Sequence, residues 1–378
     1  QTLDPMSTFS RLLSCLSLFL LLATPVLSQQ VTGTVYDADG TAVANATVFV
    51  SNTTITGFTD AEGGFSIDTP PHTTFEVVAA TENGLLGVGV FTVGETDGLR
   101  IQMDSAPELA QGTSTLSEED LMDFFTSTAF SWTKNSGDIE VVNPEVLNIF
   151  HSDTNNIISV TSNAPFEFIN PSLGYAIKIY DFSLGGNQVG YGWSGYALFT
   201  ELTPKKSKDT KTWGKNRKKA FEGSPRHFYK SLADDRVKKE EYAAFFVEGP
   251  GGTSDHSPIL EAGLKGIYNT PQPLILDGKP GDAKRMDFGG WVRVIYFGNG
   301  GDPRWERYID RYWPISELSE VMKMTINNSW ITLPDYQAFF DPSTGVDLPS
   351  ASPAIQTMGY WTFFRLADIL PDNWLPKI

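Results

Sequence analysis

Cysteine is almost absent from this chain, since its 378 residues include a single one, Cys15. Cys15 lies in an apolar stretch close to the start of the sequence. No thiol follows it, so the sequence excludes disulfide bonds, thiolate metal sites and a cysteine nucleophile from the rest of the chain. We expect the folded protein to depend on burial of apolar side chains, for which nine Trp, 13 Tyr and 25 Phe provide the material.

Long hydrophobic runs are lacking as well. The apolar stretch at residues 12–23 has about twelve residues, whereas a membrane-spanning helix needs roughly 20. Arg11 precedes the stretch, and Val26 and Ser28 occupy the small positions before a cleavage point at Gln29. This pattern predicts a leader and signal peptide over residues 1–28, and therefore an exported protein.

Histidine is scarce, and the four residues are His72, His151, His227 and His256. A zinc carboxypeptidase needs paired His and Glu ligands, the first two as His-x-x-Glu, with one open position for water. None of the four has an acidic residue three positions later, and no His-Glu-x-x-His occurs. We therefore predict no metal site, no cofactor and no zinc carboxypeptidase activity.

Positive charge is in deficit, with 28 Lys and Arg against 45 Asp and Glu and a net charge of −17. The charge is spread unevenly. Residues 205–239 hold 13 of the Lys and Arg but only four acidic residues, a local charge of +9, so the remainder carries −26. An acidic chain argues against a nucleic-acid partner, while the basic segment can meet an anionic partner locally.

Residues after the predicted signal alternate between apolar and polar, as VTGTVY at 31–36 and ANATVFV at 44–50 show. Such alternation is typical of β-strands. Asp39-Gly40 and Glu62-Gly63 lie between such runs, and there Gly tolerates the positive φ of a tight turn. Calcium binding by these acidic loops is the alternative, but neither has the alternating oxygen ligands and distant Glu of a calcium loop. We predict two hairpin turns.

These strands and turns resemble the carboxypeptidase regulatory-like domain, a transthyretin-like or prealbumin-like β-sandwich. The matching pieces are Gly33-Thr-Val35, Asp37 to Gly40, Ala46-Thr-Val48, and Thr59-Asp60 with Gly63 and Phe65. The resemblance covers about residues 30–104 and implies a seven-stranded type of sandwich with a role in scaffolding or contact. It carries over no catalytic residue, and such modules also stand at the front of bacterial envelope proteins, including outer-membrane transporters.

The small and polar segment 105–116 is typical of a linker. Ser117 and the three acidic residues after it predict a helix start. Further along, the pattern predicts strands at 157–160, 166–169, 175–180, 196–199 and 291–297, one basic helix from Trp213 to Leu232, and a helix over 359–370. The predicted fold is therefore β-dominated with two domains, the second being a larger α+β domain at 117–378 of unknown function.

Three segments of this second part resemble bacterial envelope proteins that are built behind the same module. They are FINPSLGYAIKIYDF, KNRKKAFEGSPRHFYKSL and GYWTFFRLADILP. The resemblance implies a location in the periplasm or at the outer membrane or cell surface of a Gram-negative bacterium. It supplies no activity.

Ser224 lies three residues before His227, a spacing that permits Ser-His chemistry on a helix. The interpretation that we favour is a helix start, with Ser224 as the cap and Pro225 in the first turn. A serine hydrolase would place its nucleophile on a Gly-x-Ser-x-Gly turn, which Gly192-Trp-Ser-Gly-Tyr196 lacks. We therefore predict no catalytic residue.

The basic stretch and a glycine-rich aromatic loop supply the ligand-binding candidates. They are Arg217, Lys218, Lys219, Arg226, His227, Tyr191 and Trp193. The alternative for the basic stretch is a solvated helical face, with Arg217 turned inward to hold a carboxylate through two hydrogen bonds. The two aromatic residues either stack on sugar rings or pack beneath their loop, and packing is favoured.

The sequence thus predicts a non-enzymatic, exported cell-envelope protein with a binding or assembly role. Its expected partner is a surface glycan or a partner envelope protein, and the basic segment is also compatible with peripheral membrane association. The alternative is a hydrolase acting on an envelope or imported polymer. That alternative requires a concave pocket with convergent titratable groups of perturbed pKa.

Overall fold

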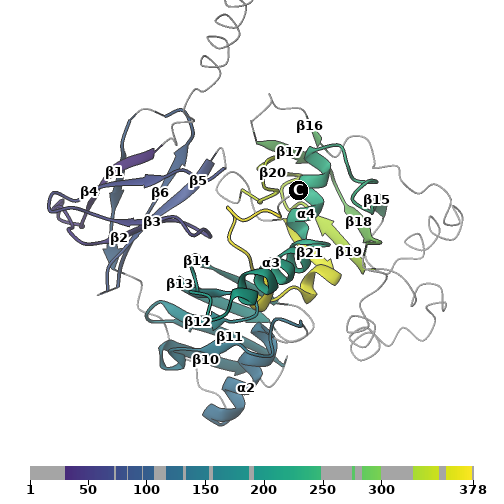
Figure 1. The fold of residues 1–378 in the computed structure, drawn as a ribbon, viewed down its shortest axis with the longest axis horizontal. Helices are drawn as coiled ribbons and strands as arrows, with labels where there is room; N and C mark the ends of the chain where they lie inside the picture. The colour runs from purple at the N-terminus through teal and green to yellow at the C-terminus, as the bar shows by residue number, and fades with distance from the viewer. Residues whose placement is uncertain are drawn as a thin grey trace, which may run out of the picture.

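The computed structural model describes residues 30–71, 74–82, 84–95, 97–105, 116–130, 133–152, 156–186, 191–247, 275–276, 283–298, 327–348 and 355–376. The predicted signal peptide, His72, His256 and most of the predicted linker lie outside these ranges. Within them the chain is β-dominated, as predicted, with several sheets and three α-helices (Figure 1).

The N-terminal part is a sandwich of two sheets, drawn in purple and blue on the left of Figure 1. One sheet has the order β4 (Gly64–Asp68), β1 (Gln30–Tyr36), β7 (Leu99–Gln102). The other has the order β3 (Thr56–Phe58), β2 (Thr47–Val50), β5 (Thr74–Ala80), β6 (Leu85–Thr92), β8 (Asp104–Ser105). The alternation seen in the sequence turns one side of each strand into a shared core that includes Val35, Val48 and Phe65.

Both acidic loops of the sandwich are turns, as predicted. Asp37 Oδ1 accepts hydrogen bonds from the backbone N–H groups of Asp39 and Thr41 at 3.0 and 2.8 Å. Asp60 Oδ1 accepts in the same way from the backbone two and four residues later, at 3.0 and 2.6 Å. The first loop leads from β1 to β2 and the second from β3 to β4, and in both cases the two strands lie in different sheets. The prediction that these turns are hairpins between paired strands is therefore wrong.

The middle part is an antiparallel sheet that carries helix α2 (Glu118–Ala129), at the bottom of Figure 1. Its strands are β9 (Glu140–Val141), β10 (Leu147–Ser152), β11 (Ile157–Ser162), β12 (Phe166–Asn170), β13 (Tyr175–Gly186) and β14 (Tyr191–Glu201). Strand β13 pairs with β14 along one side and with β12 and then β11 along the other. Ser117 caps α2 by accepting from the Asp120 N–H at 3.1 Å, which confirms the predicted helix start.

The third part places helices α3 (Ser207–Phe221) and α4 (Pro225–Ala233) beside two further sheets. One sheet contains β15 (Tyr242–Val247), β18 (Trp291–Tyr296), β19 (Asn327–Thr332) and β21 (Gln356–Gly359). The other contains β16 (Ile275–Leu276), β17 (Lys284–Asp287) and β20 (Gln337–Phe340). The aromatic face of α4 packs on their shared core through Phe228 and Tyr229.

Two helix predictions are wrong in this part. The single basic helix is two helices, because the chain breaks at Gly223, whose φ of 82° is left-handed. The predicted helix over 359–370 is a pair of short 3-10 turns, η3 (Tyr360–Phe363) and η4 (Leu366–Asp368), separated by extended backbone. Aromatic and β-branched residues dominate its first half, and they are weak helix formers.

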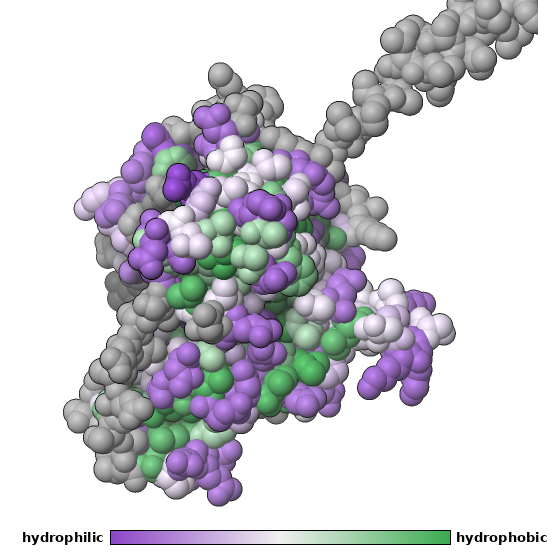
Figure 2. Space-filling model, turned by 90° about the vertical axis from the view of Figure 1, so that its left-hand side faces the viewer, coloured by the Kyte–Doolittle hydropathy of each residue, from purple (hydrophilic) through white to green (hydrophobic). Residues whose placement is uncertain are grey.

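The sandwich docks on the middle sheet through a buried apolar cluster of Phe49, Val78, Ala80 and Tyr180. The rings of Phe49 and Tyr180 lie 5.0 Å apart, centroid to centroid. Outside this contact, the sandwich exposes Val88 and Val90. On the side of the molecule that faces the viewer in Figure 2, apolar residues lie among hydrophilic ones.

Candidate functional site

The corner between α3 and α4 holds Ser224 and His227, the pair considered for Ser-His chemistry. Ser224 is the N-cap of α4, and its hydroxyl oxygen accepts a hydrogen bond from the His227 backbone N–H at 3.3 Å. Pro225 is the first residue of the helix. The predicted helix start is therefore confirmed.

Both ring nitrogens of His227 have partners. The Gly223 N–H donates to Nδ1 at 3.1 Å, so Nε2 carries the proton and faces Glu240 Oε2 at 3.4 Å. Burial lowers the pKa of His227, so its ring is neutral at pH 7. With Nδ1 occupied and Nε2 protonated, the ring is not placed to take a proton from Ser224, and it stabilises this corner instead.

Arg217 is the buried anchor of α3. Its Nε donates to the carbonyl of Leu173 at 2.8 Å, Nη2 donates to the carbonyl of Gly174 at 3.3 Å, and Nη1 donates to Glu201 Oε1 at 2.7 Å. The guanidinium lies over the Tyr175 ring, 3.9 Å from its centroid. The prediction that Arg217 points inward is confirmed, but it makes one hydrogen bond to a carboxylate, not the two predicted, and its other donors bond backbone carbonyls.

Two more side chains fix the inner face of α3 to the same turn. Trp213 Nε1 donates to the carbonyl of Pro171 at 2.9 Å, and Asn216 Nδ2 donates to the carbonyl of Ser172 at 2.8 Å. Gly174 has a φ of 74°, and a Cβ at that position would overlap the Trp213 ring. Helix α3 is therefore held in one orientation by its polar inner face.

The opposite side of α3 is an exposed stripe of lysines, which we name the lysine face. Its members are Lys208, Lys211, Lys215 and Lys219. Steps of three and four residues place them on one side of a helix. None of the four forms an ion pair with a residue in the described ranges, whereas the neighbouring Lys218 lies 3.6 Å from Glu222. The available positive charge thus belongs to these lysines rather than to Arg217, Arg226 or His227.

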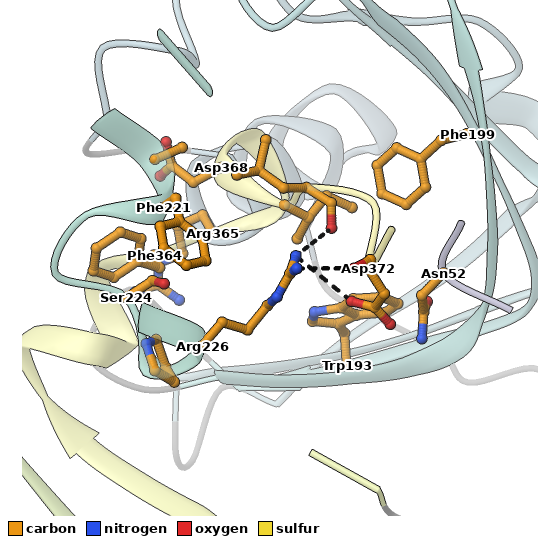
Figure 3. A pocket seen from close by; sticks show the side chains of 14 residues that line it. Asn52, Trp193, Phe199, Phe221, Ser224, Arg226, Phe364, Arg365, Asp368 and Asp372 are labelled. Atoms are coloured by element: carbon orange, nitrogen blue, oxygen red, sulfur yellow. Dashed lines mark hydrogen bonds and ion pairs between the residues drawn. The ribbon is translucent and has the colours of Figure 1, made fainter. Parts of the chain in front are cut away.

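A cavity of about 270 Å³ lies where the sandwich, β14, the α3–α4 corner and the tail after η3 meet (Figure 3). Its aromatic walls are Trp193, Phe199, Phe221 and Phe364. Its polar lining residues are Asn52, Ser224, Arg226, Arg365, Asp368 and Asp372. The cavity therefore brings together two of the predicted ligand-binding residues, Arg226 and Trp193.

The other predicted residues lie elsewhere. Arg217, Lys218, Lys219 and His227 do not line the cavity. Tyr191 begins β14 opposite Gly186. Trp193 packs one side against the core of the middle sheet while lining the cavity, in agreement with the favoured packing interpretation.

Arg226 crosses the cavity to hold the tail (Figure 3). Its Nη1 donates to the carbonyls of Leu370 and Pro371 at 3.4 and 3.2 Å, and its Nη2 donates to those of Asp372 and Trp374 at 3.0 and 3.1 Å. The Nε is buried and has no hydrogen-bond partner in the part of the chain that the structure describes. Arg226, which was predicted to bind an anionic ligand, thus binds backbone carbonyls of the tail, and its Nε is the donor that they do not use.

Asp372 is an acid of the cavity whose pKa is shifted strongly. Its Oδ1 lies 3.7 Å from Arg226 Nη1, and its side chain is 16% exposed. Burial raises the pKa of Asp372 to about 7, although Arg226 opposes this shift. The carboxyl group is therefore poorly compensated by the protein around it.

Asn52 joins the three parts of the fold. Its backbone N–H donates to the Ala197 carbonyl of β14 at 2.7 Å, and its carbonyl accepts from the Asp372 N–H at 2.7 Å. Its φ of 58° is left-handed, which Asn tolerates better than most residues. The amide nitrogen of its side chain has no hydrogen-bond partner in the described part of the chain.

Sequence reasoning missed Asn52, Asp372 and Glu240 as site residues. No local pattern marks them, because each acts through a partner distant along the chain. In the sequence, Asn52 predicts only a turn. Asp372 follows Pro371, and this pattern predicts only the end of a helix. Their roles arise from tertiary contact alone.

In the described ranges, no group of three or more His, Cys, Asp or Glu is placed to hold a metal ion. None of the described helices is long and apolar enough to cross a membrane. Comparison with protein-family models and with curated proteins found no match to this chain.

Proposed function

We propose that this chain is an exported, non-enzymatic component of a Gram-negative cell envelope that binds an acidic partner through the lysine face of α3. The partner is a surface glycan or an acidic face of another envelope protein. The proposal includes the relationship of the sandwich to carboxypeptidase regulatory-like domains, which accounts for a scaffolding front module. Its main support is four exposed lysines on one side of a fixed helix, none of which forms an ion pair with a described residue.

The rest of the chain makes this stripe distinctive. A chain with a net charge of −17 repels anions at long range. Charges on its surface are screened beyond about 8 Å at physiological ionic strength, so a local stripe governs contact. Because Trp213, Asn216 and Arg217 hold the inner face of α3, the lysines stay together on the outside.

The test compares two charge-matched double variants. Lys211→Glu with Lys215→Glu reverses the centre of the lysine face, and Lys134→Glu with Lys239→Glu makes the same charge change at exposed lysines elsewhere. Biolayer interferometry would measure binding to polygalacturonate, an acidic glycan, and to polyglutamate, an acidic polypeptide. In the first variant, two attractive charges on the lysine face become repulsive, so capture should weaken about tenfold or more. In the second variant the same change lies away from that face, so capture should weaken less than about twofold.

The two polymers identify the class of partner. Stronger capture of polygalacturonate supports a glycan, and stronger capture of polyglutamate supports a protein. Equal capture by both double variants, or no capture by the unmodified chain, would overturn the proposal.

One observation favours a second candidate, a hydrolase acting on an envelope or imported polymer. Asp372, with its pKa raised to about 7, lies in a concave cavity, as a general acid would. Against this, its nearest charged partner is the Arg226 that clamps the tail. Turnover of a polysaccharide or peptide by the purified chain, abolished in Asp372→Asn, would establish this candidate in place of the first.

A further inference from the structure

Four polar groups with unused hydrogen-bonding capacity face the same cavity. The Ser224 hydroxyl has no acceptor for its proton among the described residues, and the Asn52 amide nitrogen has no acceptor either. Arg226 Nε is buried, and no described residue is its hydrogen-bond partner. Within the described ranges, the Asp372 carboxylate has one ion pair, a long contact of 3.7 Å. Buried polar groups are normally satisfied, and among the described residues this condition is broken at Arg226 Nε. The other three groups line the same cavity and can bond a molecule that enters it.

These groups come from three separate parts of the fold. Asn52 lies between β2 and β3 of the sandwich, Ser224 and Arg226 lie at the α3–α4 corner, and Asp372 lies in the tail. Figure 3 shows Ser224 on one side of the Arg226 guanidinium and Asn52 with Trp193 on the other. A single ligand that contacts all four groups would bridge these three parts of the fold.

The charge of the lining argues for a neutral ligand. Two arginines, Arg226 and Arg365, are matched by two acids, Asp368 and Asp372. A ligand with net charge would add an ion to a site whose charges already balance, and buried unpaired charge is costly. Both donors and acceptors are on offer, so the ligand needs groups that act as both. Hydroxyl groups do so.

The size and walls of the cavity narrow the choice further. A volume of about 270 Å³ is roughly that of nine waters in the liquid, at about 30 Å³ each. One six-membered ring fits this volume. Trp193, Phe199, Phe221 and Phe364 present flat apolar surfaces for the C–H face of such a ring.

From these observations we infer that the cavity binds one neutral sugar ring, with its hydroxyls on Asn52, Ser224, Arg226 and Asp372 and its apolar face on the aromatic walls. The inference rests on the proposed binding role, and it adds a second site with its own ligand class. The lining includes Ala220 and Phe221 at the end of α3.

The experiment uses the full chain and small molecules of defined charge. Methyl β-glucoside, methyl β-galactoside and N-acetylglucosamine represent neutral rings, while benzoate and tetramethylammonium represent small anions and cations. Saturation-transfer NMR and titration would measure binding of each. We expect a neutral sugar to bind with a millimolar Kd and both ions to bind more weakly.

Asn52→Gly is the decisive variant because glycine keeps the left-handed φ and the backbone bonds of residue 52 while removing its amide. Asn45→Gly is the matched control, since Asn45 also has a φ of 58° and is exposed. We expect Asn52→Gly to raise the Kd about tenfold, as loss of one hydrogen bond does, and Asn45→Gly to leave it within about twofold. Equal melting temperatures of the two variants would confirm that the fold is kept.

No binding of any neutral sugar, preference for an ion, or a Kd unchanged by Asn52→Gly would overturn the inference. Its failure is separable from failure of the proposed function. The double variant at Lys211 and Lys215 should bind the sugar normally, and Asn52→Gly should still bind the acidic polymer through the lysine face. If the polymer binds and the sugar does not, only the cavity inference falls.

Discussion

The guanidinium of Arg226 donates a hydrogen bond to the backbone carbonyl of Trp374, 148 residues further along the chain. The same guanidinium also bonds the carbonyls of Leu370, Pro371 and Asp372. The tail does not form a strand, so the Arg226 side chain at the start of α4 supplies hydrogen bonds that a neighbouring strand would otherwise give to its backbone. Four backbone acceptors on one cation make Arg226 the residue on which the position of the tail depends.

Replacing Arg226 by Ala should therefore destabilise the protein by about 3 kcal/mol, because it leaves buried carbonyls unsatisfied and Asp372 without its cation. Urea unfolding measures the loss, and limited proteolysis should show cleavage in the tail. Lys230→Ala on the same helix removes a surface pair with Asp234 and should cost less than about 1 kcal/mol. Equal stability of the two variants would show that Arg226 does not hold the tail.

Asp372 should make stability depend on pH. In the unfolded chain an Asp carboxyl titrates near 3.9, and in the fold burial raises the pKa of Asp372 to about 7. Between these values the folded state keeps a proton that the unfolded state has lost. The free energy of unfolding therefore falls as pH rises from about 4 to about 7, and levels off above that.

The Asp372→Asn variant lacks this titration, so its stability relative to the unmodified chain should rise with pH. The upper limit of the gain, from one group moving between 3.8 and about 7, is about 4 kcal/mol. Urea unfolding at about pH 5 and about pH 8 measures it. Burial raises the pKa of Asp347 to about 6 as well, but Asp347 is present in both proteins and cancels in the difference. A difference that does not change with pH would contradict the assignment.

Arg217→Lys should destabilise the chain by about 2 kcal/mol, although it preserves the charge. A lysine ammonium cannot bond Leu173, Gly174 and Glu201 together or stack on the Tyr175 ring. Thermal unfolding measures the effect, with Lys218→Arg, an exposed neighbour, as the control that should leave the midpoint unchanged. Capture of an acidic polymer by the folded fraction should be unaltered in both. An Arg217→Lys chain of normal stability would refute the anchoring role.

The sequence predicted best what is decided locally. Alternation located β1 and β2 of the sandwich, and Ser117 and Ser224 marked two helix starts that the structure confirms. It failed where a single glycine decides the outcome. Gly223 breaks the basic segment into α3 and α4, although helical periodicity continues on both sides.

Local sequence patterns could not predict the candidate cavity, for a different reason. Arg226 and Trp193 were selected for charge and aromaticity, but nothing near them indicates that Asn52 and Asp372 lie across the same space. Pairing between the turn after β2 and the edge of β14 is a long-range event, with Thr53 forming a parallel bridge to Leu198. Composition and period do not encode such pairing.

The order in which the ribosome makes these pieces has a consequence. Residue 52 and strand β14 emerge long before residues 370–374, yet the backbone of Asn52 gains its second partner only from Asp372. Until the tail is synthesised, the guanidinium of Arg226 lacks all four of its carbonyl acceptors. The contacts of the tail with Asn52 and Arg226 thus form late in synthesis. A nascent chain stalled before Leu370 would lack them, although the sandwich and the middle sheet would already be complete.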